Sequence, residues 1–146
     1  THAVDATVDV EAASLVAWLA GQGAAPVVIA ASVRRYGLGM LDGVRLGFTD
    51  ACLGPGGAVF ALAAAEASPD TFDDGVVTGS VVARLDAAGT VTAMARIAGE
   101  DGGPVDAKAE GVAWVGAGLD PDVWVVIDRD DPAVPSELWR VRLSDA

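Results

Sequence analysis

Residues 47–80 read GFTDACLGPGGAVFALAAAEASPDTFDDGVVTGS, and this stretch decides how the rest of the chain is interpreted. An apolar segment over 58–66 has Asp50 upstream and Glu66 at its end. A tight turn, GPGG at 54–57, precedes the apolar segment. The stretch therefore predicts a β-hairpin whose strand ends carry carboxylates.

A shorter form of the same pattern, AEGVAWVGAGLDPDVWVVIDRDDPAVPSELWRVRL, returns at 109–143. Asp50 corresponds to Glu110 and Glu66 corresponds to Asp128, at nearly equal separations along the chain. A unit made only of strands and repeated along a chain is typical of a β-propeller or another repeated sheet. The usual propeller blade has about 40–50 residues, and long acidic loops explain part of the excess here.

The remaining sequence predicts one helix and a succession of short strands. Asp9 is expected to cap the helix, Glu11 to lie in its first turn and Gly21 to end it. The segment DAAG at 86–89 predicts a second tight turn. The strands are expected at 3–8, 27–37, 45–53, 58–66, 79–86, 90–97, 110–116, 122–128 and 137–143.

These elements predict an all-β fold that is part of a β-propeller, with about two to three four-stranded blades and one short inserted helix. Residues 1–146 would form the C-terminal portion of the propeller, with a partial blade at 1–38, a full blade at 45–98 and an incomplete blade at 109–143. Such a portion leaves open sheet edges, which aggregate unless they are paired. We therefore expect a second polypeptide, or further copies of this chain, to supply the missing blades.

Three segments together resemble a known family. They are LGFTDACLGPGGAVFALAAAEASPDTFDDGVVTGSVVARLD, then KAEGVAW, then VVIDRDDPAVPSELWRVRL. In this order they resemble the C-terminal half of a bacterial β-propeller family of uncharacterised function, which is distantly similar to the esterase-like phytases and the SdiA-regulated propellers. The resemblance covers about Val27 to Leu143 and implies a propeller fold. It implies no particular activity.

Composition excludes several classes of partner. The formal net charge is −12, and Lys108 is the only lysine. Nucleic acids and anionic membrane surfaces both require clustered basic residues, so neither is expected as a partner. Cys52 is the only cysteine, which excludes an internal disulfide, and it is expected to be a small core residue. The lack of disulfides and of a visible signal peptide favours the cytoplasm.

The carboxylates predict a functional face. In a propeller, Asp50 and Glu110 lie near the starts of innermost strands, and Glu66 and Asp128 lie at the ends of the next strands. All four are then expected at one mouth of the central channel. Glu66, Glu110 and Asp128 would suit a hard cation such as Ca²⁺, while crowding could make one of these carboxyls a general acid or base.

A simpler interpretation applies to the acids of the loops, because Asp side chains often stabilise turns by accepting backbone N–H groups. Lys108, two residues before Glu110, is expected to pair with a carboxylate there or to be an ordinary surface lysine. The loop acids for which turn formation is favoured are Asp70, Asp73, Asp74, Asp130 and Asp131.

Thr1 provides the sharpest functional hypothesis. A free N-terminal threonine can act as a nucleophile with its own α-amine as the base. The predicted enzyme is a self-processed hydrolase of an amide or ester in a small-molecule or peptide-like substrate, in which Thr1, Asp50, Glu66, Lys108 and Glu110 form the catalytic group. The alternative hypothesis is a non-catalytic propeller that binds a ligand or Ca²⁺ in its channel. A third hypothesis is a scaffold whose only task is assembly.

Overall fold

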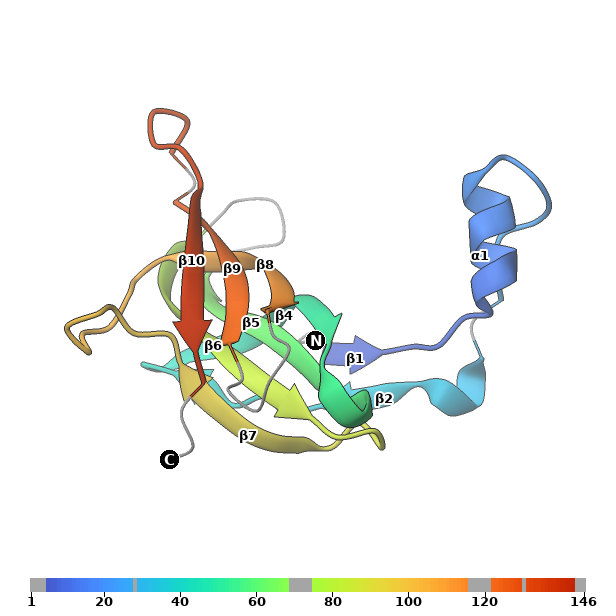
Figure 1. Ribbon diagram of the computed structural model, residues 1–146, viewed down its shortest axis with the longest axis horizontal. Helices are drawn as coiled ribbons and strands as arrows, with labels where there is room; N and C mark the ends of the chain where they lie inside the picture. Colours follow the sequence, from blue (N-terminus) through green and yellow to red (C-terminus); the bar gives the residue numbers. More distant parts are fainter. Residues whose placement is uncertain (1–4, 28, 69–74, 116–121, 130, 144–146) are drawn as a thin grey trace. The chain divides into compact units, whose positions relative to one another are not determined.

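The computed structural model describes residues 5–27, 29–68, 75–115, 122–129 and 131–143. The chain divides into two compact units, Thr1–Gly37 and Leu38–Ala146, and each is described separately below. The described residues are mostly β-structure with one short helix (Figure 1), which confirms the predicted all-β class.

The first unit is built on a short antiparallel pair. Strand β1 (Asp5–Thr7) pairs with β2 (Arg34–Tyr36), and the hydroxyl groups of Thr7 and Tyr36 lie 3.1 Å apart. A 3₁₀ turn at Ala30–Ser32 precedes β2, so the predicted strand at 27–37 is wrong except for its last part. The turn is closed by Ser32, whose backbone N–H and hydroxyl both donate to the Ile29 carbonyl.

The helix α1 (Ala12–Leu19) lies where the sequence predicted it, but Asp9 does not cap it. The Glu11 carboxylate is the cap, and it accepts the backbone N–H groups of Ala13 at 3.1 Å and Ser14 at 2.7 Å. The prediction failed because Asp is the commoner capping residue, whereas the longer Glu11 side chain folds back over the first turn. Asp9 instead lies 3.8 Å from Arg34.

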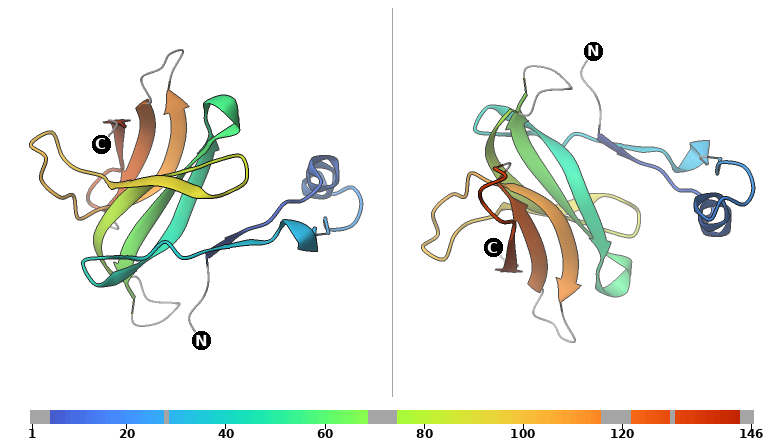
Figure 2. Two further views of the ribbon diagram at one scale, coloured as in Figure 1. Left: turned by 90° about the horizontal axis from the view of Figure 1, so that it is seen from below. Right: turned by 90° about the horizontal axis from the view of Figure 1, so that it is seen from above.

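The second unit begins with a five-stranded antiparallel meander in the order β3–β4–β5–β6–β7. The sheet is strongly curled, as both views of Figure 2 show. Strand β3 was not predicted, although its two-residue connection Asp42-Gly43 is a strong hairpin signal. Both turn residues have positive φ, 50° and 82°. The strands are β3 (Met40–Leu41), β4 (Val44–Leu53), β5 (Val59–Ala67), β6 (Val76–Leu85) and β7 (Val91–Arg96).

A three-stranded antiparallel sheet follows, in the order β10–β9–β8. It consists of β8 (Lys108–Val115), β9 (Asp122–Asp128) and β10 (Glu137–Arg142), and its strands closely match the predicted ones. The turns GPGG and DAAG are also confirmed: the Gly54 N–H binds the Ala58 carbonyl, and the Gly89 N–H binds the Asp86 carbonyl.

The core of this unit lies between the two sheets. Phe60 and Leu62 of β5 pack with Val123, Val125 and Ile127 of β9, and all five side chains are buried. Each side chain of this size contributes about 1.5–3 kcal/mol when fully buried. Phe60 also stacks on Trp114 of β8, with the ring centroids 5.0 Å apart. The contact between the sheets is therefore an apolar core rather than a loose junction.

The two meanders repeat one strand pattern, but their alignment differs from the sequence prediction. Strands β4 and β8 each have one β-bulge. Thr49 is the extra residue of β4, and Glu110 is the extra residue of β8. Glu110 therefore corresponds to Thr49 and not to Asp50. After the bulges, the strand register makes Leu62 equivalent to Val126 in the repeat. The predicted match of Glu66 with Asp128 would have made Leu62 equivalent to Trp124 instead. The predicted and observed alignments of the two meanders differ because each bulge adds one residue to a strand and the turns differ in length.

Candidate binding site at the ends of β5, β8 and β9

Lys108 joins two of the predicted site residues. Its Nζ lies 3.3 Å from Glu66 Oε2 and 3.3 Å from Glu110 Oε1, so the end of β5 meets the start of β8. The side chains of Lys108 and Glu66 are only 17% and 20% exposed, while that of Glu110 is 41% exposed. Asp128 faces Lys108 across the β8–β9 ladder. We call Glu66, Lys108, Glu110 and Asp128 the charged cluster.

Glu66 is the most firmly held member of the cluster. Its Oε1 accepts the Gly75 N–H and the Ser68 hydroxyl, each at 2.8 Å. The hydrogen bond from the Gly75 backbone, reinforced by Ser68 and by Lys108, lowers the pKa of Glu66 from its usual value. The carboxylate is consequently ionised at neutral pH and accepts hydrogen bonds, and it is not a proton donor there.

A shallow depression of about 380 Å³ lies beside the cluster. Asp128 belongs to both features. The other lining residues, 131–132 and 134–136, come from the connection between β9 and β10. Asp131 accepts the Ala133 N–H at 2.8 Å, so this acid stabilises its turn, as the simpler interpretation predicted.

Asp50 has a different position from the one predicted. Its carboxylate accepts the backbone N–H of Val112 at 2.7 Å and so connects β4 with β8. Thr49 next to it donates its hydroxyl to the Ala109 carbonyl at 2.6 Å. Asp50 therefore carries out a structural task at the edge of β8, which the sequence did not reveal because the contact joins segments far apart in the chain.

The cluster offers limited chemistry. Two carboxylates around one ammonium favour charge pairing over proton transfer. The ammonium of Lys108 lies between Glu66 and Glu110, where the predicted cation was to bind. In the parts of the chain that the structure describes, no three His, Cys, Asp or Glu side chains are grouped so that they could hold a metal ion.

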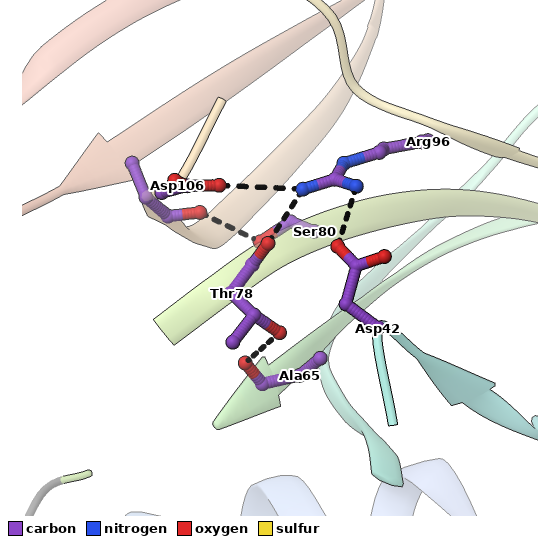
Figure 3. Close-up of polar contacts among 7 residues, drawn as sticks. Asp42, Ala65, Thr78, Ser80, Arg96 and Asp106 are labelled. Carbon is purple, nitrogen blue, oxygen red and sulfur yellow. Dashed lines mark hydrogen bonds and ion pairs between the residues drawn. The ribbon is translucent and has the colours of Figure 1, made fainter. Parts of the chain in front are cut away.

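A second polar group, centred on Arg96 of β7, was missed by the sequence analysis (Figure 3). Arg96 donates to Asp42 Oδ2 at 2.7 Å, to the Thr78 carbonyl at 2.6 Å and to Asp106 Oδ1 at 3.3 Å. These contacts join the β3–β4 turn, β6 and the segment after β7. In the sequence, only the Asp42-Gly43 turn could have indicated part of this group. The other contacts depend on the curl of the sheet, which brings distant segments together.

Cys52, Thr1 and four of the loop acids are the remaining residues singled out in the sequence. Cys52 is partly buried against the core, and burial raises the pKa of its thiol, which agrees with a small packing residue and not with a nucleophile. Thr1 lies outside the described residues. So do the predicted turn acids Asp70, Asp73, Asp74 and Asp130.

Comparison with known proteins assigns the chain to a family. Residues 1–132 match the model described as Family of unknown function (DUF6910), and the chain belongs to this family. Searches of the curated proteins and of the solved structures each found no match. Among the described residues, no helical segment has the length and apolar character needed to cross a membrane.

Proposed function

We propose that the two meanders are neighbouring blades of a β-propeller completed by a second polypeptide, and that the charged cluster binds a positively charged ligand without catalysis. The single observation that carries the binding function is the position of the cluster. Three carboxylates and one ammonium, with a formal charge of 1 − 3 = −2, lie at the meeting point of β5, β8 and β9 beside the depression.

The order of the strands supports the propeller. Strands β4 to β7 are the four long strands of the five-stranded meander, β8 to β10 form three strands of another, and β8 lies beside β4 and β5. Blades of a propeller pack face to face in this way around first strands that lie close together. Strand β10 ends its sheet without a further strand among the described residues, as an incomplete blade would.

The state of the carboxylates supports binding over hydrolysis. Glu66 is committed to the Gly75 N–H, to Ser68 and to Lys108, and its lowered pKa makes it a weak base as well as an ionised group. Glu110 is the most exposed of the three residues joined by the ion pairs, and it is the carboxylate we expect to contact a ligand. The net charge of −12 would attract a cation from a distance. Hydrolysis by Thr1 stays a prediction.

The test is a calorimetric titration of the whole chain at low salt with three probes, which are Ca²⁺, spermidine and a short oligolysine peptide. We expect binding by one of the organic cations, weakened about 2- to 5-fold by Glu110→Gln, since one exposed charge pair contributes at most about 1 kcal/mol. The matched control is Glu100→Gln, an exposed carboxylate outside the cluster, which should leave the affinity unchanged. Added salt should weaken binding.

Two results would overturn this proposal. One is the absence of binding by all three probes at low salt, and the other is an equal effect of Glu110→Gln and Glu100→Gln. Tight Ca²⁺ binding with no binding of spermidine or oligolysine would instead favour a calcium-binding propeller.

A further inference from the structure

Two of the four tryptophans have no place in the core. Trp114 stacks on Phe60, and Trp139 packs against the same cluster. Trp18 of α1 and Trp124 of β9 are instead 46% and 38% exposed. A large aromatic side chain in this state is typical of a surface that another protein covers.

Trp124 belongs to an apolar outer face of the three-stranded sheet. Val126, two residues on, is 39% exposed, and Leu138, which faces Val126 across the ladder, is 63% exposed. The alternate residues of β9 point to the core, so this strand carries apolar side chains on both faces, with Trp124 and Val126 between Asp122 and Asp128 on the outer one, while the described residues of the second unit cover only the inner face. Strands that are apolar on both faces occur in sheets that are covered on both faces.

Helix α1 is the second exposed apolar surface. Its sequence is AASLVAWL, Ser14 is its only polar residue, and none of its residues is buried. Val16 is 65% exposed and Leu19 is 71% exposed. A helix that is apolar all round is normally enclosed, so α1 also requires a covering surface.

The charges next to the two surfaces are complementary. Residues 1–37 contain three acids and two arginines, and Asp9 lies 3.8 Å from Arg34, so Glu11 is the acid beside α1 that is available to a partner. The outer face of the sheet is bordered by Arg140 and Arg142, whose side chains are 60% and 80% exposed. Both arginines share the single carboxylate of buried Asp122, which leaves a positive charge at this border.

We propose that the outer face of β8–β9–β10 is the docking surface for α1 of a second copy of this chain. Leu15, Val16 and Leu19 of the helix cover Trp124, Val126 and Leu138, and Glu11 at the start of α1 approaches Arg140 and Arg142. Each copy has both the helix and the sheet surface. Two copies can therefore each place α1 on the sheet of the other, which covers all four surfaces and forms a two-fold symmetric dimer. This interface does not depend on the proposed ligand site, but it uses the face of β8–β9–β10 that the next blade of the proposed propeller would cover. A dimer formed through this face would therefore contradict the propeller and leave the ligand site unaffected.

The experiment measures the mass of the full chain in solution by light scattering across a range of concentrations. We expect a dimer, and we expect Val16→Asp on the helix and Leu138→Asp on the sheet each to weaken dimerisation at least about 10-fold. Val27→Asp and Val76→Asp are the matched controls: these positions are 83% and 75% exposed, lie off both surfaces and should leave the dimer intact. Circular dichroism verifies that every variant is folded.

An equimolar mixture of Val16→Asp and Leu138→Asp decides which surfaces meet. The mixture retains one intact pair of helix and sheet, so it should form a heterodimer where each variant alone is monomeric. A helix-to-helix dimer would be insensitive to Leu138→Asp, and a sheet-to-sheet dimer would be insensitive to Val16→Asp. Either result, or a wild-type monomer at every concentration, overturns the proposal. Tryptophan emission gives an independent readout, because dilution of a true dimer should shift it to longer wavelength.

Discussion

At the residue scale, Glu66 illustrates how a carboxylate serves structure and a candidate site together. Hydrogen bonds from Gly75 and Ser68 and the ion pair with Lys108 favour its charged form. Its folded-state pKa is therefore lower than the value of 4.5 expected for an unperturbed glutamate. Because the folded pKa is depressed, the stabilisation is complete above the unfolded pKa and is lost as the pH falls through the folded pKa.

This predicts a specific pH dependence of stability. The difference in free energy of unfolding between the wild type and Glu66→Gln should favour the wild type at pH 7, stay nearly constant down to about pH 5, and shrink below pH 4.5. Urea denaturation between pH 7 and pH 3 measures it. A difference that grows on acidification would show that the pKa of Glu66 is raised and would contradict the hydrogen bonds described above.

At the scale of elements, the edge of β8 depends on side chains of the other sheet. Ser80 of β6 is buried, donates to the Ala107 carbonyl at 2.9 Å and accepts the Ala109 N–H at 3.0 Å. Ser80→Ala would leave both backbone groups unpaired in the interior, and we expect it to lower the free energy of unfolding by about 2–4 kcal/mol. The control is Thr92→Ala, which removes an exposed hydroxyl from the same sheet and should change stability by less than about 0.5 kcal/mol.

Denaturant titration of both variants checks this prediction. Equal losses for Ser80→Ala and Thr92→Ala would mean that β8 is held by the apolar core alone. The slope of the unfolding free energy against denaturant should stay the same, because the substitution changes stability without changing the surface exposed on unfolding.

The elements themselves were largely predictable, while their exact pairing was not. Apolar segments between Gly, Pro and Asp punctuation located β4 to β10, because these local signals set where a strand starts and stops. The bulges at Thr49 and Glu110 depend on contacts between sheets, so the predicted repeat carried a small register error. The short strand β2 replaced a predicted long one because Ser32 closes a turn that competes with extended structure.

The candidate site was predictable as a set of charges but not as a geometry. Placing Glu66, Glu110 and Asp128 at one end of the sheets followed from strand direction, and pairing with a carboxylate was one of the two roles expected for Lys108. The bond from Asp50 to the Val112 backbone could not be foreseen, because it requires knowing which edge of β8 faces β4. The Arg96 group depends in the same way on the curl of the first sheet.

At the scale of the whole molecule, the two units should differ in their ability to fold alone. Every member of the apolar core between the sheets lies within 38–146, whereas the described part of the first unit has only Ser32 and Tyr36 buried. We predict that a fragment of residues 38–146 unfolds cooperatively, with a midpoint within about 5–8 °C of the full chain, since about 1 kcal/mol shifts the midpoint of a domain of this size by that order. A peptide of residues 1–37 should show no cooperative transition.

The sharper comparison removes the second sheet. A fragment of residues 38–107 keeps the complete five-stranded meander but loses Val123, Val125 and Ile127, which cover one face of β5. It should therefore expose Phe60 and Leu62, bind a hydrophobic dye and melt without a cooperative transition. Calorimetry and dye binding on the two fragments decide the matter. If 38–107 were as cooperative as 38–146, the first sheet would be a self-sufficient domain, and the packing of β9 against β5 would not be what stabilises this unit.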